Sequence, residues 1–510
     1  MNIKNAKKQI KNAITAYLTK NARGEYIIPI ERQRPVFLMG PPGIGKTTIM
    51  EQIATEMNIG ILSYSMTHHT RQSALGLPFI EHKTYQGKEY SISEYTMSEI
   101  IASIYELMEE TGIKEGILFL DEINCVSETL APVMLQFLQY KIFGRHRVPQ
   151  GWIIVTAGNP PEYNNSVREF DIVTWDRLKR IDIEPDFDVW KEYAYYTGIH
   201  QSIITYLEIK KNDFYTIETT VDGKSFVTAR GWEDLSRIIG VYEMNNIEVD
   251  KELIQQYLQN KKIAQKFADY YILFNKYKSD YQINFILSGK VSDEIKKRAI
   301  NSTFDERLSL IGLMLDAVVS EMKQTIIYKK VILELQNTLK NYKIKITDTK
   351  KSPYEYMLEI IAEKSSMIAV RKIAGSISEN DIVVINSMID FLANYAKKII
   401  SENDIEKAFS AISKEFNTQV QHLKLIVKET TQKMNNILTF TSEVFGNDQE
   451  ILILITELTA NYYSANFIGE FGGGDYHKYN KELLFYERQI TIEQAINSLN
   501  LLEENLTEDE

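Results

Sequence analysis

Residues 36–47 read Val-Phe-Leu-Met-Gly-Pro-Pro-Gly-Ile-Gly-Lys-Thr. An apolar run stops at Gly40, a glycine-rich turn follows, and a lysine–threonine pair opens a helical pattern. This is a complete G-x-x-x-x-G-K-[ST] phosphate-binding loop. Gly43 and Gly45 allow backbone angles that turn successive N–H groups toward a phosphate, and the following helix adds its positive N-terminal end. The stretch predicts a nucleotide site built from a strand, a loop and a helix.

The loop also predicts how the nucleotide is held. We expect Lys46 to reach the β- and γ-phosphates and the Thr47 hydroxyl to ligate Mg²⁺. The expected cofactors are therefore ATP and Mg²⁺. The predicted nucleotide-binding residues of this segment are Gly40, Pro41, Pro42, Gly43, Ile44, Gly45, Lys46, Thr47 and Thr48.

A second apolar strand pattern, residues 116–120, runs directly into Asp121 and Glu122. We expect Asp121 to hold Mg²⁺ through water, and Glu122 to orient and polarise the water that attacks the γ-phosphate. The alternative is a charged strand end at the protein surface. The position of the pair downstream of a complete phosphate loop favours the catalytic interpretation.

The next strand pattern, residues 151–157, stops at Gly-Asn-Pro-Pro, which places Asn159 at a strand tip. An amide there can hydrogen-bond the γ-phosphate and the attacking water, although Asn-Pro taken alone only marks a turn. Arg177 and Arg180 come next, at the N-terminal edge of a predicted strand over residues 181–183. Either is a candidate arginine finger for the ATP of a neighbouring subunit, and we favour Arg177. The alternative is a solvated charge cluster.

Arg230 opens a predicted helix that runs through residue 241. We expect it to touch the γ-phosphate from a small lid, and the alternative is a surface arginine near a helix start. Strand and helix patterns alternate up to residue 183, which predicts a parallel sheet with helices on both faces. The phosphate loop would lie at the carboxyl end of its strand, where such sheets bind ligands.

These motifs, in this order, resemble the AAA+ ATPases over residues 30–245. More narrowly they resemble the MoxR-like branch, through Leu-Phe-Leu-Asp-Glu-Ile-Asn at 118–124, Ala-Gly-Asn-Pro at 157–160 and Trp-Asp-Arg-Leu at 175–178. The chain departs from that branch at Leu178, where phenylalanine is usual, and at Cys125, where arginine is usual. The branch carries an insertion after the second strand, and residues 75–78 lie where it would be; a hairpin before Asn159 matches residues 145–149.

The resemblance implies a homo-oligomeric ring, usually a hexamer, with ATP at each subunit interface. It also implies a protein client that is remodelled, matured or activated, with a partner that bears a von Willebrand factor A domain. Two alternatives stay open: a motor or loader that acts on nucleic acid, and a scaffold that uses ATP only to assemble. We see no zinc or helix-turn-helix pattern that would support the nucleic-acid alternative.

The domain plan follows from these patterns. We predict an N-terminal helix and lead-in over residues 1–30, an α/β nucleotide-binding core over 31–185, a lid over 186–248, and a mostly α-helical C-terminal extension over 249–510. Helical patterns in the extension cover 253–276, 306–342, 354–374, 381–400, 404–440 and 450–467. Capping boxes are predicted at Thr303, Ser378 and Ser401. The lysine-rich stretch 343–353 is a possible hinge.

Composition sets broad limits on function. The 510 residues carry 58 basic and 69 acidic side chains, a formal net charge of −11, which argues against non-specific nucleic-acid binding as the main role. The single cysteine, Cys125, fits a reducing cytosol. We find no secretory signal and no apolar run near the ~20 residues of a membrane span, so we expect a cytoplasmic protein without membrane insertion.

Overall fold

The computed structural model describes residues 1–163, 166–220, 223–347, 351–446 and 448–481. The chain divides into two compact units. The first contains Met1–Trp190, Val227–Gly231 and Asn337–Phe409; the second contains Lys191–Phe226, Trp232–Gln336 and Ser410–Glu510. Two long helices, α14 (Phe304–Ile346) and α17 (Ile405–Phe445), contribute residues to both units.

A five-stranded parallel sheet forms the centre of the first unit, with the strand order β2-β5-β8-β1-β9. The strands are β1 (Val36–Met39), β2 (Gly60–Ser65), β5 (Gly116–Asp121), β8 (Trp152–Gly158) and β9 (Lys179–Asp182). The central strands β1, β5 and β8 are buried on both faces, and this is why they read as nearly continuous apolar runs in the sequence. The edge strands β2 and β9 are partly exposed and carry polar residues. The predicted fold class, a P-loop α/β core followed by a helical extension, is confirmed.

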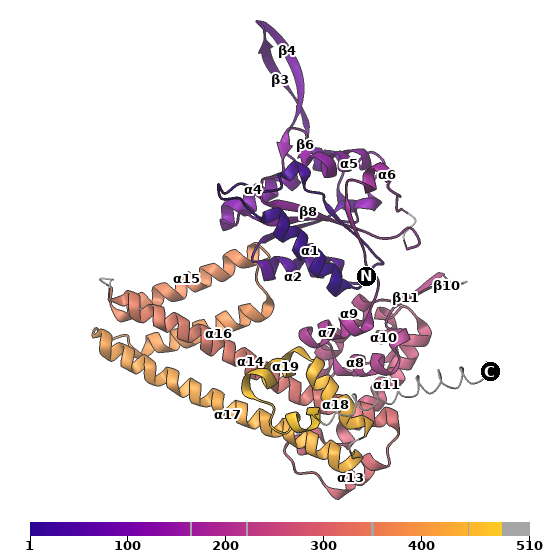
Figure 1. Ribbon diagram of the computed structural model, residues 1–510, viewed down its shortest axis with the longest axis vertical. Coiled ribbons are helices and arrows are strands. Elements are labelled where there is room, and N and C mark those ends of the chain that lie inside the picture. The colour runs from indigo at the N-terminus through magenta and orange to yellow at the C-terminus, as the bar shows by residue number, and fades with distance from the viewer. Residues whose placement is uncertain (164–165, 221–222, 348–350, 447, 482–510) are drawn as a thin grey trace, which may run out of the picture. The chain divides into compact units, whose positions relative to one another are not determined.

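Helices cover both faces of this sheet (Figure 1). Helices α1 (Ile3–Leu18) and α2 (Lys46–Met57) pack on the face that carries Phe119 and Val155. Helices α4 (Glu99–Thr111) and α5 (Ala131–Tyr140) pack on the opposite face, which carries Leu118 and Ile154. Neighbouring residues of one strand alternate between the two cores because side chains along a strand point to opposite faces.

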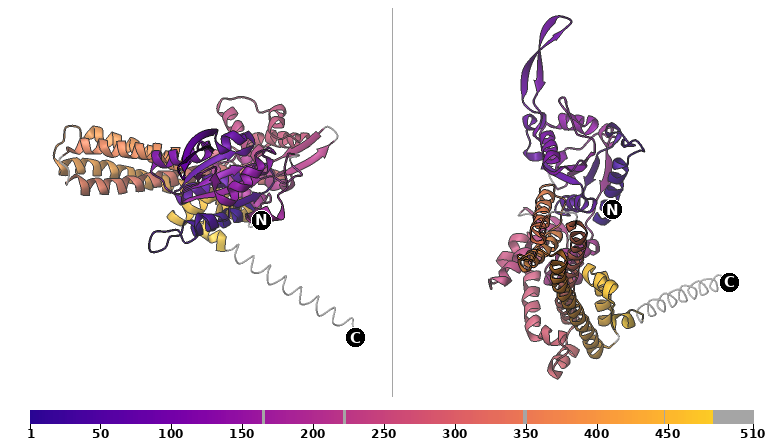
Figure 2. Two further views of the ribbon diagram at one scale, coloured as in Figure 1. Left: turned by 90° about the horizontal axis from the view of Figure 1, so that it is seen from above. Right: turned by 90° about the vertical axis from the view of Figure 1, so that its left-hand side faces the viewer.

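A long β-hairpin follows the second strand of the sheet and was not predicted as such. After the 3₁₀ turn η2 (Met66–His68) and the short helix α3 (Arg71–Leu75), strands β3 (Pro78–Tyr85) and β4 (Lys88–Tyr95) pair in antiparallel fashion. Its turn has positive φ at Gln86 and Gly87, as a two-residue hairpin turn requires. The hairpin extends away from the sheet (Figure 2) and begins where residues 75–78 were expected to carry an insertion.

A second, minimal hairpin precedes β8. It consists of β6 (Ile142–Phe143) and β7 (His146–Arg147), close to the predicted hairpin at residues 145–149. The short helix α6 (Ile172–Trp175) precedes β9. The first unit also contains a helical hairpin from the C-terminal half of the chain, formed by α15 (Pro353–Ile373) and α16 (Glu379–Lys398), and α15 packs against α4.

The second unit is mainly helical. Its helices are α8 (Gln201–Ile209), α10 (Lys251–Tyr257), α11 (Lys261–Asp280), α12 (Ile283–Leu287), α13 (Asp293–Ile300), α18 (Gln449–Ala460), α19 (Tyr462–Phe471), and most of α7 (Phe187–Thr197) and α9 (Ala229–Met244). It also contains the hairpin strand β10 (Thr216–Thr220) and all of β11 (Gly223–Val227) except its last residue. Lys191 of α7 makes a partly buried ion pair with Glu457 of α18, so helices far apart in sequence pack together in this unit.

Several helix boundaries differ from the prediction. The patterns over 253–276 and 450–467 each break into two helices, because Asn260 and Asn461 cap the second helix with their side chains. Asp404, and not Ser401, caps α17 by accepting the backbone N–H of Glu406 at 2.9 Å, so the box predicted at Ser401 is wrong. The caps at Thr303 and Ser378 are confirmed by hydrogen bonds to the N–H groups three residues later.

The predicted hinge is partly helical. Helix α14 continues to Ile346, and Tyr342 and Ile346 are both buried, so residues 343–346 are not a polar linker. Residues 348–350 lie outside the described residues. Ser352 begins α15 with a capping box completed by Glu355, which explains why the turn ends there. Across the described parts of the chain, no helix is both long and apolar enough to span a bilayer.

Candidate active site

The phosphate-binding loop joins β1 to α2, and its glycines are required by geometry. Gly43 and Gly45 have φ values of 72° and 92°, which side chains other than glycine rarely adopt. A Cβ on Gly40 would lie 2.8 Å from the carbonyl oxygen of Ile183, and one on Gly43 would lie 2.8 Å from Oγ1 of Thr228. The loop is therefore held closely between β9 and the start of α9.

Lys46 is buried and fully engaged. Its Nζ donates to the carbonyl oxygens of Gly40 at 2.8 Å and Pro41 at 3.0 Å, and to Oδ1 of Asn159 at 2.8 Å. Burial lowers the pKa of Lys46 to about 8, opposed by the nearby charge of Asp121. These bonds hold the Lys46 nitrogen at the phosphate loop, where we expect it to meet phosphate oxygens.

Thr47 and Asp121, the two residues expected to hold Mg²⁺, lie side by side. The Thr47 hydroxyl donates to Oδ2 of Asp121 at 3.0 Å, and Oδ1 of Asp121 accepts the backbone N–H of Glu122 at 2.9 Å. One hydroxyl and one carboxylate oxygen next to a phosphate loop form the hard-oxygen donor set that suits Mg²⁺, which keeps most of its waters and binds phosphate. The residues present therefore fit Mg²⁺.

Glu122 is held by two hydroxyl groups that sequence reasoning missed. Its Oε2 accepts hydrogen bonds from Ser65 Oγ at 3.1 Å and from Thr67 Oγ1 at 3.0 Å. Ser65 ends β2 and pairs in register with Asp121, so the hydroxyl and the carboxylate meet at the same edge of the sheet. Glu122 also has a φ of 56°, an uncommon backbone conformation for a side chain of this kind.

Asn159 follows β8 directly, as expected, and its position is fixed by Asn124. The Nδ2 of Asn124 donates to the carbonyl oxygen of Asn159 at 2.8 Å, and Asn124 is almost fully buried. A Cβ on Gly158 would lie 2.5 Å from Oδ1 of Asn124, so this turn also requires glycine. Sequence reasoning used Asn124 only as part of a resemblance and assigned it no role.

The two candidate arginine fingers differ in what holds their side chains. Arg177 is exposed and donates to Oε1 of Gln139 at 2.6 Å. Arg180 lies inside β9 and not at its edge; its guanidinium bonds Asp182 at 2.8 Å and lies over the ring of Trp175 at 4.7 Å. Arg177 is therefore the less constrained of the two.

A cavity of about 550 Å³ adjoins the first residues of the phosphate loop. Arg180 faces it from β9. The cavity is also lined by Gly40 and Pro41 of the loop, Asn124 of the 3₁₀ turn after β5, Pro160 of the turn after β8, and Trp175 of α6.

Arg230 lies next to the phosphate loop in the first unit. Its backbone N–H donates to the carbonyl oxygen of Gly43 at 3.1 Å, and its charge contributes to lowering the pKa of Lys46. Arg230 thus starts α9 beside the loop, as the sequence predicted. Its segment, Val227–Gly231, belongs to the same compact unit as the loop.

Comparison with known families decides what this arrangement is. Residues 36–174 match the family described as "ATPase family associated with various cellular activities (AAA)". These residues form an AAA ATPase domain. Lys46, Asp121, Glu122 and Asn159 lie inside the matched part of the AAA domain, whereas Arg177, Arg180 and Arg230 lie beyond its end.

Two other comparisons add little to the AAA assignment. Among solved structures, a point mutant of Thermotoga maritima RuvB is 18% identical in sequence, with a TM-score of 0.26, over 59% of this chain and 75% of that one. At this TM-score the likeness supports no further argument. No curated protein matches the sequence.

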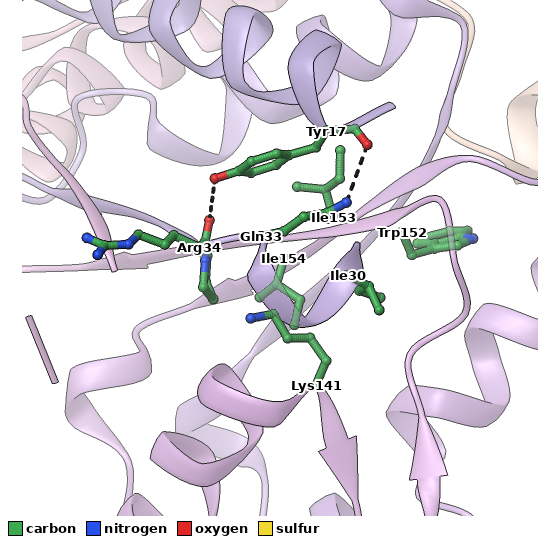
Figure 3. A pocket seen from close by; sticks show the side chains of 9 residues that line it. Tyr17, Ile30, Gln33, Arg34, Lys141, Trp152, Ile153 and Ile154 are labelled. Carbon is green, nitrogen blue, oxygen red and sulfur yellow. Dashed lines mark hydrogen bonds between the residues drawn. The ribbon is translucent and has the colours of Figure 1, made fainter. Parts of the chain in front are cut away.

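The AAA domain contains a second buried lysine, outside the loop (Figure 3). Lys141 follows α5, and its Nζ donates to the carbonyl oxygen of Leu138 at 3.0 Å. Burial lowers its pKa to about 8, as it does for Lys46. The pocket around it is lined also by Tyr17, Gln33 and Trp152 and leaves no room for a water molecule. We therefore interpret Lys141 as a structural residue and not as part of a ligand-binding site.

Proposed function

We propose that this chain is an Mg²⁺-dependent ATPase of the MoxR-like branch that works as a cytoplasmic homo-oligomeric ring, usually a hexamer. Its client would be a protein that it remodels, matures or activates, with a partner bearing a von Willebrand factor A domain. The observation that carries the ATPase part is one constellation: Lys46 bonded to Asn159, Thr47 bonded to Asp121, and Glu122 beside them at the same sheet edge. The ring and the partner rest on the family resemblance.

The geometry supports a direct hydrolysis. Lys46 and the loop N–H groups would bind the β- and γ-phosphates, and Thr47 and Asp121 would hold Mg²⁺, which neutralises phosphate charge. Glu122 would orient a water so that its oxygen bonds the γ-phosphorus while the bond to the bridging oxygen breaks. That oxygen leaves with ADP, and the water proton passes to Glu122 or to the released phosphate. Asn159 would hold the γ-phosphate and the water in line.

An arginine from a neighbouring subunit would complete the site. A guanidinium stabilises the charge that develops on the transferred phosphoryl group. Both side chains are exposed. We assign this role to Arg177, because it is held by one neutral amide, whereas Arg180 is held by a carboxylate and an aromatic ring. Arg230, beside Gly43, would contact the γ-phosphate from the start of α9.

The test compares two buried lysines of the same domain. Lys46→Met and Lys141→Met remove the same charge from equally hidden positions, and both lysines have a pKa near 8. We expect Lys46→Met to lose binding of a fluorescent ATP analogue and all Mg²⁺-dependent phosphate release, and Lys141→Met to retain both. Equal losses in the two variants, or turnover without Lys46, would refute the assignment of the site.

The partner assignment needs a separate experiment. Glu122→Gln should hold ATP without hydrolysing it and so keep its client bound. We expect a tagged Glu122→Gln chain to retain a von Willebrand factor A-domain protein in the presence of ATP, and Lys46→Met to release it. If both variants retain the same proteins, or the stalled ring holds DNA and not protein, this part of the proposal is wrong.

A further inference from the structure

One turn of the C-terminal half of the chain touches the edge of the AAA sheet. The backbone N–H of Ile61, in the edge strand β2, donates to the carbonyl oxygen of Ala374 at 3.1 Å. Ala374 ends α15 and is fully buried. Figure 1 shows the C-terminal end of α15 meeting the core, from which the chain turns back into α16. All of these residues belong to the first compact unit.

The approach is so close that only glycine fits at the next position. Gly375 has a φ of 63°, and a Cβ there would lie 2.6 Å from Cγ2 of Ile61. The turn is also internally braced, since the N–H of Ser376 donates to the carbonyl oxygen of Arg371 at 3.0 Å and Ser376 is buried. A braced, buried turn that needs glycine in order to touch a strand is a built contact between the two segments.

Strand β2, which makes this contact, ends beside Glu122. Four residues beyond Ile61, β2 ends at Ser65, whose hydroxyl bonds Glu122, and Thr67 of η2 adds the second bond. Four residues of strand span about 13 Å, and β2 is paired with β5 over that whole distance. Helix α4, against which α15 packs, also packs against β2. The turn after α15 thus contacts β2 directly, and α15 itself packs against α4, which lies against the same strand.

We infer that the α15–α16 helical hairpin regulates ATP turnover, because its Ala374–Gly375 turn holds β2 in the position where Ser65 and Thr67 restrain Glu122. Detaching the turn loosens the end of β2 and frees the Glu122 carboxylate to orient water. A protein that pulls on the hairpin would thus raise turnover without touching the nucleotide. Ala374 and Gly375 are positioning residues in this account, and the inference rests on the proposed ATPase function.

The test uses a matched pair of glycines in the full chain. Gly375→Ala and Gly375→Val force the turn away from Ile61, whereas Gly112→Ala introduces the same strain at a helix end with φ of 70° and nothing within 4 Å. The expected result for Gly375 variants is faster amide hydrogen exchange in residues 60–65 and a kcat raised by about threefold or more, with an unchanged KM for ATP. Gly112→Ala should change neither quantity.

A second background shows whether the effect passes through Glu122. In a Ser65→Ala/Thr67→Ala chain the restraint is already absent, so Gly375→Ala should add nothing to kcat. If Gly375→Ala raises kcat equally in that background, the inference is overturned. It is also overturned if the Gly375 variants leave amide exchange in residues 60–65 unchanged, or if they speed that exchange without changing kcat. If the unmodified chain shows no turnover that depends on Glu122, the proposed function fails, and this inference with it. Thermal unfolding of each variant identifies any that has merely lost its fold.

Discussion

Lys46 Nζ lies 2.8 Å from Oδ1 of Asn159, a residue 113 positions further along the chain. The bond joins the phosphate loop to the tip of β8, two elements that the parallel sheet brings to one edge. Both groups are expected to contact the γ-phosphate, and in this structure they contact each other. The bond therefore places both side chains where one phosphate group could meet them.

The lowered pKa of Lys46 predicts a pH-dependent ATP affinity. With a pKa of about 8, Lys46 in the folded chain is mostly protonated at pH 7 and mostly neutral at pH 9. Phosphate binds the protonated form. We expect the affinity for ATP to fall about tenfold from pH 7 to pH 9, with proton uptake on binding above pH 8. Titration calorimetry in buffers of different ionisation enthalpy measures both quantities.

Lys46→Arg provides the control, because an arginine stays protonated throughout this range. Any residual ATP binding by that variant should be flat between pH 7 and pH 9. A flat profile in the unmodified chain would contradict the prediction.

The hydroxyls of Ser65 and Thr67 should restrain Glu122 at rest. Each hydrogen bond to a carboxylate contributes about 1.5–3 kcal/mol, so their removal favours the free carboxylate. We expect Ser65→Ala/Thr67→Ala to raise kcat for ATP several-fold and leave its KM unchanged, while Ser65→Thr/Thr67→Ser, which keeps both hydroxyls, stays close to the unmodified chain. Steady-state phosphate release measures this. A lower kcat in the alanine variant would mean that the hydroxyls support catalysis.

Arg177 should act on the ATP of a neighbouring subunit. Arg177→Ala alone should lose about 10³-fold or more in kcat, the usual contribution of an arginine finger. The Glu122→Gln chain is expected to be inactive on its own. Rings that contain both variants should recover part of the activity, because at some interfaces the intact Glu122 of one subunit meets the intact Arg177 of its neighbour. Phosphate release across mixing ratios tests this. Full activity of Arg177→Ala, with loss in Arg180→Ala, would transfer the role to Arg180.

The contacts of Glu243 are expected to stabilise the second unit at neutral pH and to lose that effect in acid. The hydrogen bond and ion pair with His200, supported by the Tyr271 hydroxyl at 2.8 Å, lower the pKa of Glu243 to about 2. A carboxyl with a depressed folded-state pKa stabilises the fold above its unfolded pKa, near 4.5, and loses that contribution as the pH falls toward 2.

Glu243→Gln should therefore unfold at a lower temperature than the unmodified chain at pH 7, and the gap should narrow between pH 4.5 and pH 3. Calorimetric scans across that range measure the gap, and Tyr271→Phe, which keeps the carboxylate, should show a smaller effect. A gap that stays constant with pH would contradict the assignment of Glu243.

The parts of the fold that sequence predicted are those with local causes. The central strands β1, β5 and β8 read as nearly continuous apolar runs, and the phosphate loop is set by glycines within eight residues. The β3–β4 hairpin was missed because many of its side chains are exposed, so no apolar alternation marks its strands, and its Gln-Gly turn is a weak hairpin signal. Asn260 and Asn461 were missed because helical periodicity continues across the caps.

Contacts between distant segments account for the rest. Ser65, Thr67 and Asn124 reach the candidate site only through the register of the sheet, and nothing near them in sequence distinguishes them from other polar residues. Likewise, nothing in either segment predicts that Ala374 meets Ile61, 313 residues earlier. Ser65 is a hydroxyl residue at the end of β2, and β2 pairs with the strand that carries Asp121. That placement is the one signal in the sequence that would have led to Ser65.

The most direct test of the account is the Glu122→Gln variant. The amide keeps the size of the side chain and can still accept the Ser65 and Thr67 hydroxyls, but it cannot take a proton from water. We predict that ATP binds to the variant as tightly as to the unmodified chain, while Mg²⁺-dependent turnover falls by about 10²-fold or more. Unchanged turnover in a variant that still binds ATP would show that Glu122 does not activate the water, and the proposed mechanism would be wrong.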